Sequence, residues 1–146
     1  MTAVDLPPIV KEAQKLFGCL PNFEWAAADF RRYVTAQRFD ALFCSHLLEY
    51  ASELELPEWL AQMAGCIRPE GTAAFLTFLR DAESGSLEQL NLFELSTGVN
   101  GERLGHVCTP SEIEKALRKA GASDIVCAPL PKGPSYSEYL VTCTWA

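Results

Sequence analysis

Segments of strand length alternate with longer segments of helical periodicity along this chain. The run 39–45 is almost continuously apolar, which is typical of a parallel strand buried on both faces. This alternation predicts an α/β fold with a mostly parallel sheet. The predicted strands are Thr2–Asp5, Phe23–Ala28, Phe39–Ser45 and Thr72–Leu79, and the predicted helices are Pro7–Leu20, Leu54–Ile67, Leu87–Leu95 and Thr109–Gly121.

Turn and capping signals define the rest of the order. Arg68–Gly71 combines a proline and a glycine, which predicts that the preceding helix stops and the chain turns there. Thr109 and Glu112 have the spacing of a helix-capping box. The last two apolar segments, Asp124–Leu130 and Glu138–Trp145, are joined by a connection too short for a parallel crossover. They therefore predict a terminal antiparallel hairpin in a single domain over 1–146.

Charge and composition exclude several classes of partner. The formal net charge is −7 and no dense stripe of Lys or Arg occurs, so we expect no nucleic-acid partner. No apolar run approaches the ~20 residues of a membrane-spanning helix, and the sequence shows no secretory signal. We therefore expect a cytoplasmic protein with no membrane partner. The six cysteines lack metal-ligand spacing. We expect reduced core thiols and no metal site.

An acidic residue, Asp5, directly follows the first predicted strand. In open α/β sheets, an acid at the carboxyl end of a strand is a natural partner for ribose hydroxyls. The strand and glycine-rich turn that would precede it and hold the rest of a nucleotide are absent from the sequence. Gly98, Gly101 and Gly105 do not replace them, because they follow the buried strands instead of joining a strand to a helix.

In combination, several segments resemble the class I S-adenosylmethionine-dependent methyltransferases, and within them the O-methyltransferase family. The resemblance covers essentially the whole chain and corresponds to the carboxyl-terminal part of a complete family member. It implies an incomplete Rossmann-like methyltransferase sheet that lacks its first central strand. The segments that carry it are Val4–Val10, Ala28–Phe30, Phe39–Leu48, Arg68–Thr72 and Thr109–Gly121.

The resemblance implies a role for five residues in binding S-adenosylmethionine. Asp5 resembles the acid that bonds both ribose hydroxyls, and Leu6 lies beside it. Asp29 resembles the acid that faces the adenine amino group, and Phe30 the apolar residue that packs on that ring. Ser45 ends the buried strand where the family brings the methyl donor and acceptor together.

Two residues are candidate catalytic groups. His46 follows Ser45, and the catalytic histidine of the family aligns with Glu49. A carboxylate is a weak base for a phenol, and other class I methyltransferases place a glutamate here that need not be catalytic. Structural readings stay open beside these: a strand-end histidine bonded to backbone at His46, and a helix-opening acid favoured by the helix dipole at Asp5.

The missing strand implies a partner. In the family it lies between the strand ending at Asp5 and the strand ending at Ser45, so both would present apolar edges that seek pairing from another chain. We expect an obligate oligomer, with these two strands at or near the interface. The completing chain is a separately encoded protein that supplies the strand and glycine-rich turn, or a second copy of this chain; alternatively, the strands close up and the cofactor site is lost.

Two functions follow from these expectations. The first is the carboxyl-terminal subunit of a split methyltransferase, which O-methylates a small-molecule acceptor and binds S-adenosylmethionine only with its partner. The second is a catalytically inactive, methyltransferase-like scaffold or regulatory subunit. A shortened gene product is a third reading, tested by an in-frame glycine-rich segment directly upstream. The acceptor is not deducible from the sequence.

Overall fold

The computed structural model describes residues 1–18, 20–80, 105–131 and 138–145. The chain divides into two compact units, Met1–Ala36 and Gln37–Ala146, and each is described by itself. The helix expected at Leu87–Leu95 lies outside the described residues, as do Gly98 and Gly101. The single domain over 1–146 stays a prediction.

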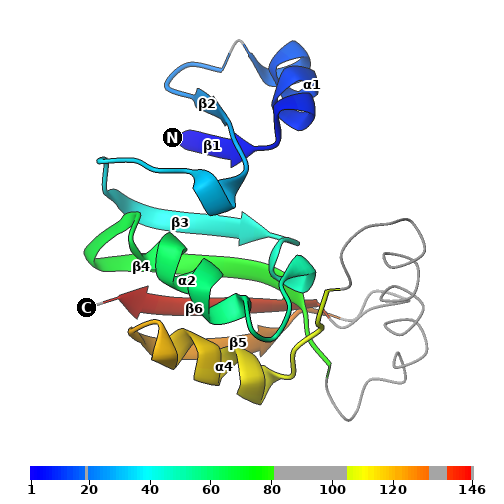
Figure 1. The fold of residues 1–146 in the computed structure, drawn as a ribbon, viewed down its shortest axis with the longest axis vertical. Coiled ribbons are helices and arrows are strands. Elements are labelled where there is room, and N and C mark those ends of the chain that lie inside the picture. The colour runs from blue at the N-terminus through cyan, green and yellow to red at the C-terminus, as the bar shows by residue number, and fades with distance from the viewer. Residues whose placement is uncertain (19, 81–104, 132–137, 146) are drawn as a thin grey trace. The chain divides into compact units, whose positions relative to one another are not determined.

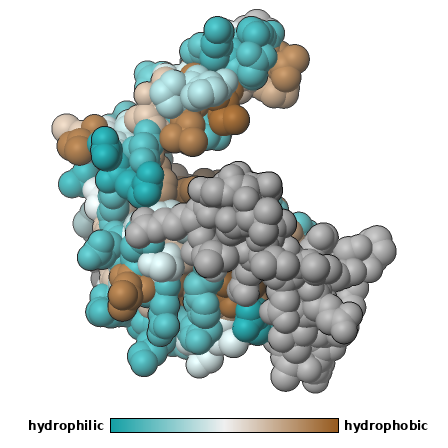
Figure 2. Space-filling model, turned by 45° about the vertical axis from the view of Figure 1, so that its right-hand side comes forward, coloured by the Kyte–Doolittle hydropathy of each residue, from teal (hydrophilic) through white to brown (hydrophobic). Residues whose placement is uncertain are grey.

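The first unit is a strand–helix–strand motif (Figure 1). β1 (Thr2–Asp5) and β2 (Glu24–Ala27) pair in parallel, and α1 (Pro7–Phe17) connects them. Pro7 lies in the first turn of α1, where its missing N–H costs no hydrogen bond. Apolar patches lie among hydrophilic side chains on the surface of this unit (Figure 2), and Leu16 is 72% exposed. A short 3₁₀ helix, η1 (Phe30–Arg32), follows β2.

The second unit contains a mixed sheet of strand order β3-β4-β6-β5. β3 (Phe39–Ser45) and β4 (Ile67–Phe78) are parallel, whereas β6 (Glu138–Trp145) is antiparallel to both β4 and β5 (Ala122–Pro129). The α/β class and the terminal antiparallel hairpin are therefore confirmed. None of the described helices is both long and apolar enough to span a membrane.

Two helices cover one face of this sheet, α2 (Leu56–Ala64) and α4 (Pro110–Lys119) (Figure 1). The capping box predicted for α4 is present: Glu112 N–H donates to Thr109 Oγ1 at 3.2 Å, and Thr109 N–H donates to Glu112 Oε2 at 2.7 Å. Alternate residues of β4 and β6 are buried, as expected for strands with one covered face. The core includes Leu60, Ile113, Leu117, Ala73, Phe75, Tyr139, Val141, Cys143 and Trp145.

The start of β4 differs from the sequence expectation. The helix ends at Ala64 and the strand begins at Ile67, so Arg68–Gly71 lies within the strand. The turn signal appears there as a bulge, because pairing with β3 shifts register beyond Ile67 and Glu70 adopts a positive φ of 64°.

Burial of β3 on both faces is also a wrong expectation. Cys44 is buried, but Phe43 is 68% exposed. The reason is position: β3 is one of the two edge strands of the four-stranded sheet, and the described helices of its unit lie on one face.

Candidate functional site

The carboxyl ends of β1 and β2 bring two acidic residues to one edge of the first unit. Asp5 ends β1 opposite Ala27, and Asp29 follows two residues beyond that position. Asp5 is exposed, and its Oδ1 accepts the Leu6 N–H at 2.7 Å, which orients the carboxylate at the helix start. Leu6 itself is 51% exposed. An oriented, solvent-facing carboxylate at this edge can accept hydrogen bonds from a diol.

Asp29 is held by its own segment. It is the N-cap of η1, and its Oδ1 accepts the Arg31 backbone N–H at 3.0 Å. The Arg31 guanidinium also forms an ion pair with both carboxylate oxygens. Hydrogen bonding from Arg31 lowers the pKa of Asp29 below its ordinary value. Asp29 is therefore an ionised cap, and Phe30, the first residue of η1, is half-buried beside it.

His46 lies where the chain leaves β3 in the second unit. Ser45 is the last residue of β3 and is exposed, and His46 then adopts a positive φ of 47°. Its backbone N–H donates to Leu76 O at 2.8 Å, which continues the β3–β4 pairing by one residue. Its imidazole packs on Phe78 with ring centroids 4.6 Å apart.

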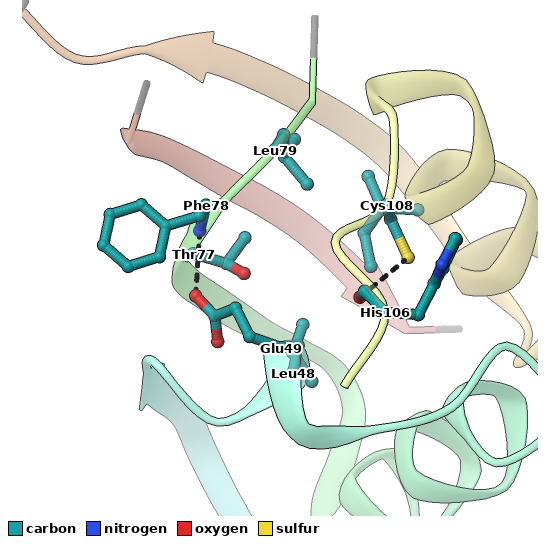
Figure 3. A pocket seen from close by; sticks show the side chains of 8 residues that line it. Leu48, Glu49, Thr77, Phe78, Leu79, His106 and Cys108 are labelled. Carbon is teal, nitrogen blue, oxygen red and sulfur yellow. Dashed lines mark hydrogen bonds between the residues drawn. The ribbon is translucent and has the colours of Figure 1, made fainter. Parts of the chain in front are cut away.

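The His46 imidazole also lies between two carboxylates. Nδ1 is 3.2 Å from Glu49 Oε1, and Nε2 is 3.4 Å from Glu138 Oε1. Glu49 belongs to the 3₁₀ helix η2 (Leu48–Tyr50), and its side chain is 2% exposed. Glu49 Oε1 also accepts the Phe78 N–H at 2.8 Å, and Oε2 is buried without a hydrogen-bond partner among the described residues (Figure 3). Glu49 thus ties η2 to β4 and orients His46.

A small pocket opens beside Glu49 (Figure 3). Its cavity volume is about 10 Å³. This is below the ~300 Å³ at which pockets for drug-sized ligands begin, so it suits a small group and not a nucleotide. The lining residues are Leu48, Glu49, Thr77, Phe78, Leu79, His106, Cys108 and Ile113.

The predicted site residues fall into two groups. Asp5, Leu6, Asp29 and Phe30 belong to the first unit, and the segment Ser45–Glu49 belongs to the second. Their roles in binding and catalysis stay predictions.

Sequence reasoning missed Glu138 and the Phe78 backbone, which complete the surroundings of His46. Phe78 is 29 positions from Glu49, and Glu138 is farther still along the chain. No local pattern connects them to His46.

A family model described as a methyltransferase domain matches residues 1–126. No match was found among curated protein sequences. Among solved structures, the apo S-adenosylmethionine-dependent methyltransferase SibL is similar, with a TM-score of 0.82, 18% identity, and coverage of 99% of this chain and 42% of that one. The mitomycin 7-O-methyltransferase MmcR matches with a TM-score of 0.80, 22% identity, and coverage of 99% and 41%.

Human N-acetylserotonin methyltransferase, solved in complex with S-adenosylmethionine, matches with a TM-score of 0.78, 18% identity, and coverage of 99% and 40%. The chain therefore spans about two fifths of the length of these solved proteins. At these identities the likeness concerns the fold.

Proposed function

The chain belongs to the methyltransferase-domain family, and on that premise we propose that it contributes the ribose and adenine side of an S-adenosylmethionine site. The reaction is methyl transfer to the oxygen of a small-molecule acceptor. The sulfonium is a reactive methyl donor, so the protein's task is to align donor and acceptor and to remove the acceptor proton. A second chain completes the site.

The single observation that carries the proposal is the position of Asp5. It ends β1 beside the parallel strand β2, and its carboxylate is exposed and oriented by the Leu6 N–H. Two carboxylate oxygens match the two hydroxyls of a ribose. For Asp29, an adenine amino group would compete with Arg31 for the carboxylate. We therefore assign the stronger contact to Asp5 and the adenine-side contacts to Asp29 and Phe30.

The acceptor side of the proposal rests on His46. Its ring is 35% exposed and lies at the end of a parallel strand, where ligands bind in open α/β sheets. Glu49 is too enclosed to meet an acceptor directly, and it instead fixes the imidazole through Nδ1. In this arrangement His46 receives the acceptor proton and Glu49 is a positioning residue.

The outer edge of β3 supports a completing chain. β3 is one of the two edge strands of its sheet, and its Phe43 is exposed. An exposed apolar strand edge is a template for pairing with a further strand. We propose that the completing chain, a separately encoded protein or a second copy of this one, supplies a strand and a glycine-rich turn.

Light scattering of the purified chain at low micromolar concentration tests the assembly. The proposal predicts an oligomer or a polydisperse sample. A monodisperse particle of the chain mass, 16.1 kDa, with a sharp cooperative melt would contradict it.

Calorimetric titration with S-adenosylhomocysteine tests the cofactor site. We expect negligible binding to the chain alone, and clear binding once the product of the neighbouring open reading frame is present. Tight binding by the isolated chain would refute the split site.

A second candidate function is a catalytically silent scaffold. It is favoured by the burial of Glu49, whose carboxylate serves contacts within the fold, and by the small volume of the adjacent pocket. Asp5→Asn and Asp29→Asn variants of the complex separate the two functions. If the complex assembles and methylates as the wild type does, these residues hold no cofactor and the scaffold function is the correct one.

A further inference from the structure

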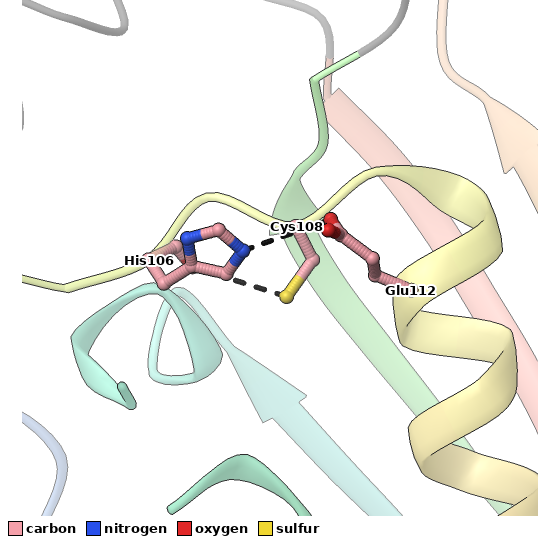
Figure 4. Close-up of side chains that lie close together, drawn as sticks. All are labelled: His106, Cys108 and Glu112. Atoms are coloured by element: carbon pink, nitrogen blue, oxygen red, sulfur yellow. Dashed lines mark hydrogen bonds and ion pairs between the residues drawn. The ribbon is translucent and has the colours of Figure 1, made fainter. Parts of the chain in front are cut away.

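Three potential metal ligands gather beside the start of α4 (Figure 4). His106 and Cys108 lie in the segment that leads into α4, and Glu112 lies in its first turn. Their ligand atoms all lie within 4.8 Å of one another. The expectation of no metal site rested on the spacing of cysteines and histidines. The Glu112 carboxylate adds a third possible ligand, which that spacing does not reveal.

The backbone that carries these ligands is anchored on both sides. Gly105 packs so closely that a Cβ there would lie 1.5 Å from a backbone oxygen of η2. His106 N–H donates to Ala51 O at 3.1 Å, and Arg80 N–H donates to Cys108 O at 2.8 Å. The fold therefore fixes the backbone of residues 105–108 beside the start of α4.

The imidazole and carboxylate are both suited to a cation. His106 Nε2 is buried with no hydrogen-bond partner among the described residues, and Glu112 Oε2 is 3.6 Å away. A buried polar atom without a partner costs about 1–3 kcal/mol, and a metal ion would satisfy it. The Thr109 N–H donates to Glu112 Oε2 at 2.7 Å and holds this carboxylate beside His106.

The thiol completes the set. Cys108 is buried, and its Sγ lies 4.0 Å from the backbone oxygen of His106. The Glu112 carboxylate near this sulfur attracts a cation. When the cation binds, the Sγ–H bond breaks, its proton passes to solvent and the metal–sulfur bond forms.

We propose that His106, Cys108 and Glu112 bind one Zn²⁺ ion through Nε2, Sγ and a carboxylate oxygen. Nitrogen, sulfur and oxygen together are a ligand set that zinc accepts, and three protein ligands leave one coordination position open. His106 and Cys108 also line the pocket beside Glu49, whose volume of about 10 Å³ is at the lower limit for one water molecule.

The geometry requires a modest closure of the cluster. Tetrahedral zinc bonds of about 2.0 Å to nitrogen and 2.3 Å to sulfur place ligand atoms roughly 3.3–3.8 Å apart. The ligand atoms must therefore approach by about 1 Å from their present limit of 4.8 Å. The His106 and Glu112 side chains are 34% and 47% exposed and have space to move.

Metal titration of the full chain tests this site. The protein is stripped with a chelator under reducing conditions and titrated with Zn²⁺ by calorimetry, and with Co²⁺ by absorption spectroscopy. We expect one ion per chain and a thiolate-to-cobalt charge-transfer band. In calorimetry, the observed enthalpy should vary with the protonation enthalpy of the buffer, because Sγ releases its proton. Cys108→Ser should abolish the band, and His106→Gln should weaken Zn²⁺ binding by at least about 100-fold, since even outer-shell partners of ligands are worth about 10- to 100-fold.

Two further variants make the test selective. Glu112→Gln removes the charge but keeps a residue type that completes a capping box, so α4 should persist. The affinity for Zn²⁺ should fall. Cys127→Ser is the matched control, because Cys127 is a partly buried thiol on β5 outside the cluster. This variant should bind Zn²⁺ as tightly as the wild type does. Absence of stoichiometric binding would overturn the proposal. Binding that survives both His106→Gln and Cys108→Ser, or that is lost in Cys127→Ser, would overturn it as well.

Discussion

Replacing Glu49 by alanine should destabilise the protein by about 2–3 kcal/mol. The change removes the 2.8 Å hydrogen bond that the Phe78 N–H donates to the Glu49 carboxylate. Hydrogen bonds to charged groups are worth about 1.5–3 kcal/mol. It also removes a buried methylene, worth about 0.8 kcal/mol. Against this, the variant no longer buries Oε2 without a partner, which offsets part of the loss.

Glu49→Gln tests how much of this loss comes from the charge, because the side chain keeps its shape. Glutamine keeps the volume and one acceptor for the Phe78 N–H, so we expect a loss of about 1 kcal/mol. Glu53→Ala is the control, because Glu53 is exposed and exposed substitutions usually change stability by less than about 0.5 kcal/mol. Urea unfolding followed by tryptophan fluorescence, at one fixed protein concentration, measures all three variants. A change below about 0.5 kcal/mol for Glu49→Ala would refute the reasoning.

Three other perturbations have defined outcomes. Gly105→Ala should lower the free energy of unfolding by about 1–3 kcal/mol or more, because the new Cβ would lie 1.5 Å from a backbone oxygen. Gly65→Ala should lower it far less, because the nearest atom to its Cβ is 3.2 Å away. Equal urea midpoints for the two variants would contradict this. Thr109→Ala should lower the unfolding free energy by about 1 kcal/mol through loss of the α4 cap, with Ser111→Ala as an exposed control that stays near wild type. Burial raises the pKa of Cys44 from 9.0 to about 12, so the folded state keeps a proton that the unfolded chain releases. The contribution of Cys44 to the free energy of unfolding is complete below about pH 9 and is lost as the pH rises toward 12. Urea unfolding across this pH range should show a smaller decline for Cys44→Ala than for the wild type. An equal decline in both proteins would contradict the prediction.

Local signals made the strands, the capping box and the terminal hairpin predictable. Thr109 and Glu112 are three positions apart, so their reciprocal hydrogen bonds follow from spacing alone. The start of β4 was not predictable in this way. It depends on pairing between Ile67 and Phe39, and the apolar sequence up to Ile67 fits a helix as well as a strand.

The same contrast holds for the candidate site. The placement of Asp5 at the end of a parallel strand, and of His46 near Glu49, could be predicted because each is local in sequence. The contact between His46 and Glu138 could not, because it requires the order in which β3, β4 and β6 pair. The cluster at Cys108 escaped for a related reason, since its carboxylate is recruited by the capping geometry of α4.

The most direct test of the account asks whether Asp5 binds the ribose. Calorimetry on the completed complex would compare S-adenosylhomocysteine with its 2′-deoxy analogue, using the wild-type chain and Asp5→Asn. A hydrogen bond to a charged group is worth about 1.5–3 kcal/mol, so loss of the hydroxyl should weaken wild-type binding by about 10- to 100-fold. In Asp5→Asn the two ligands should bind almost equally. The same loss in both proteins would contradict the account.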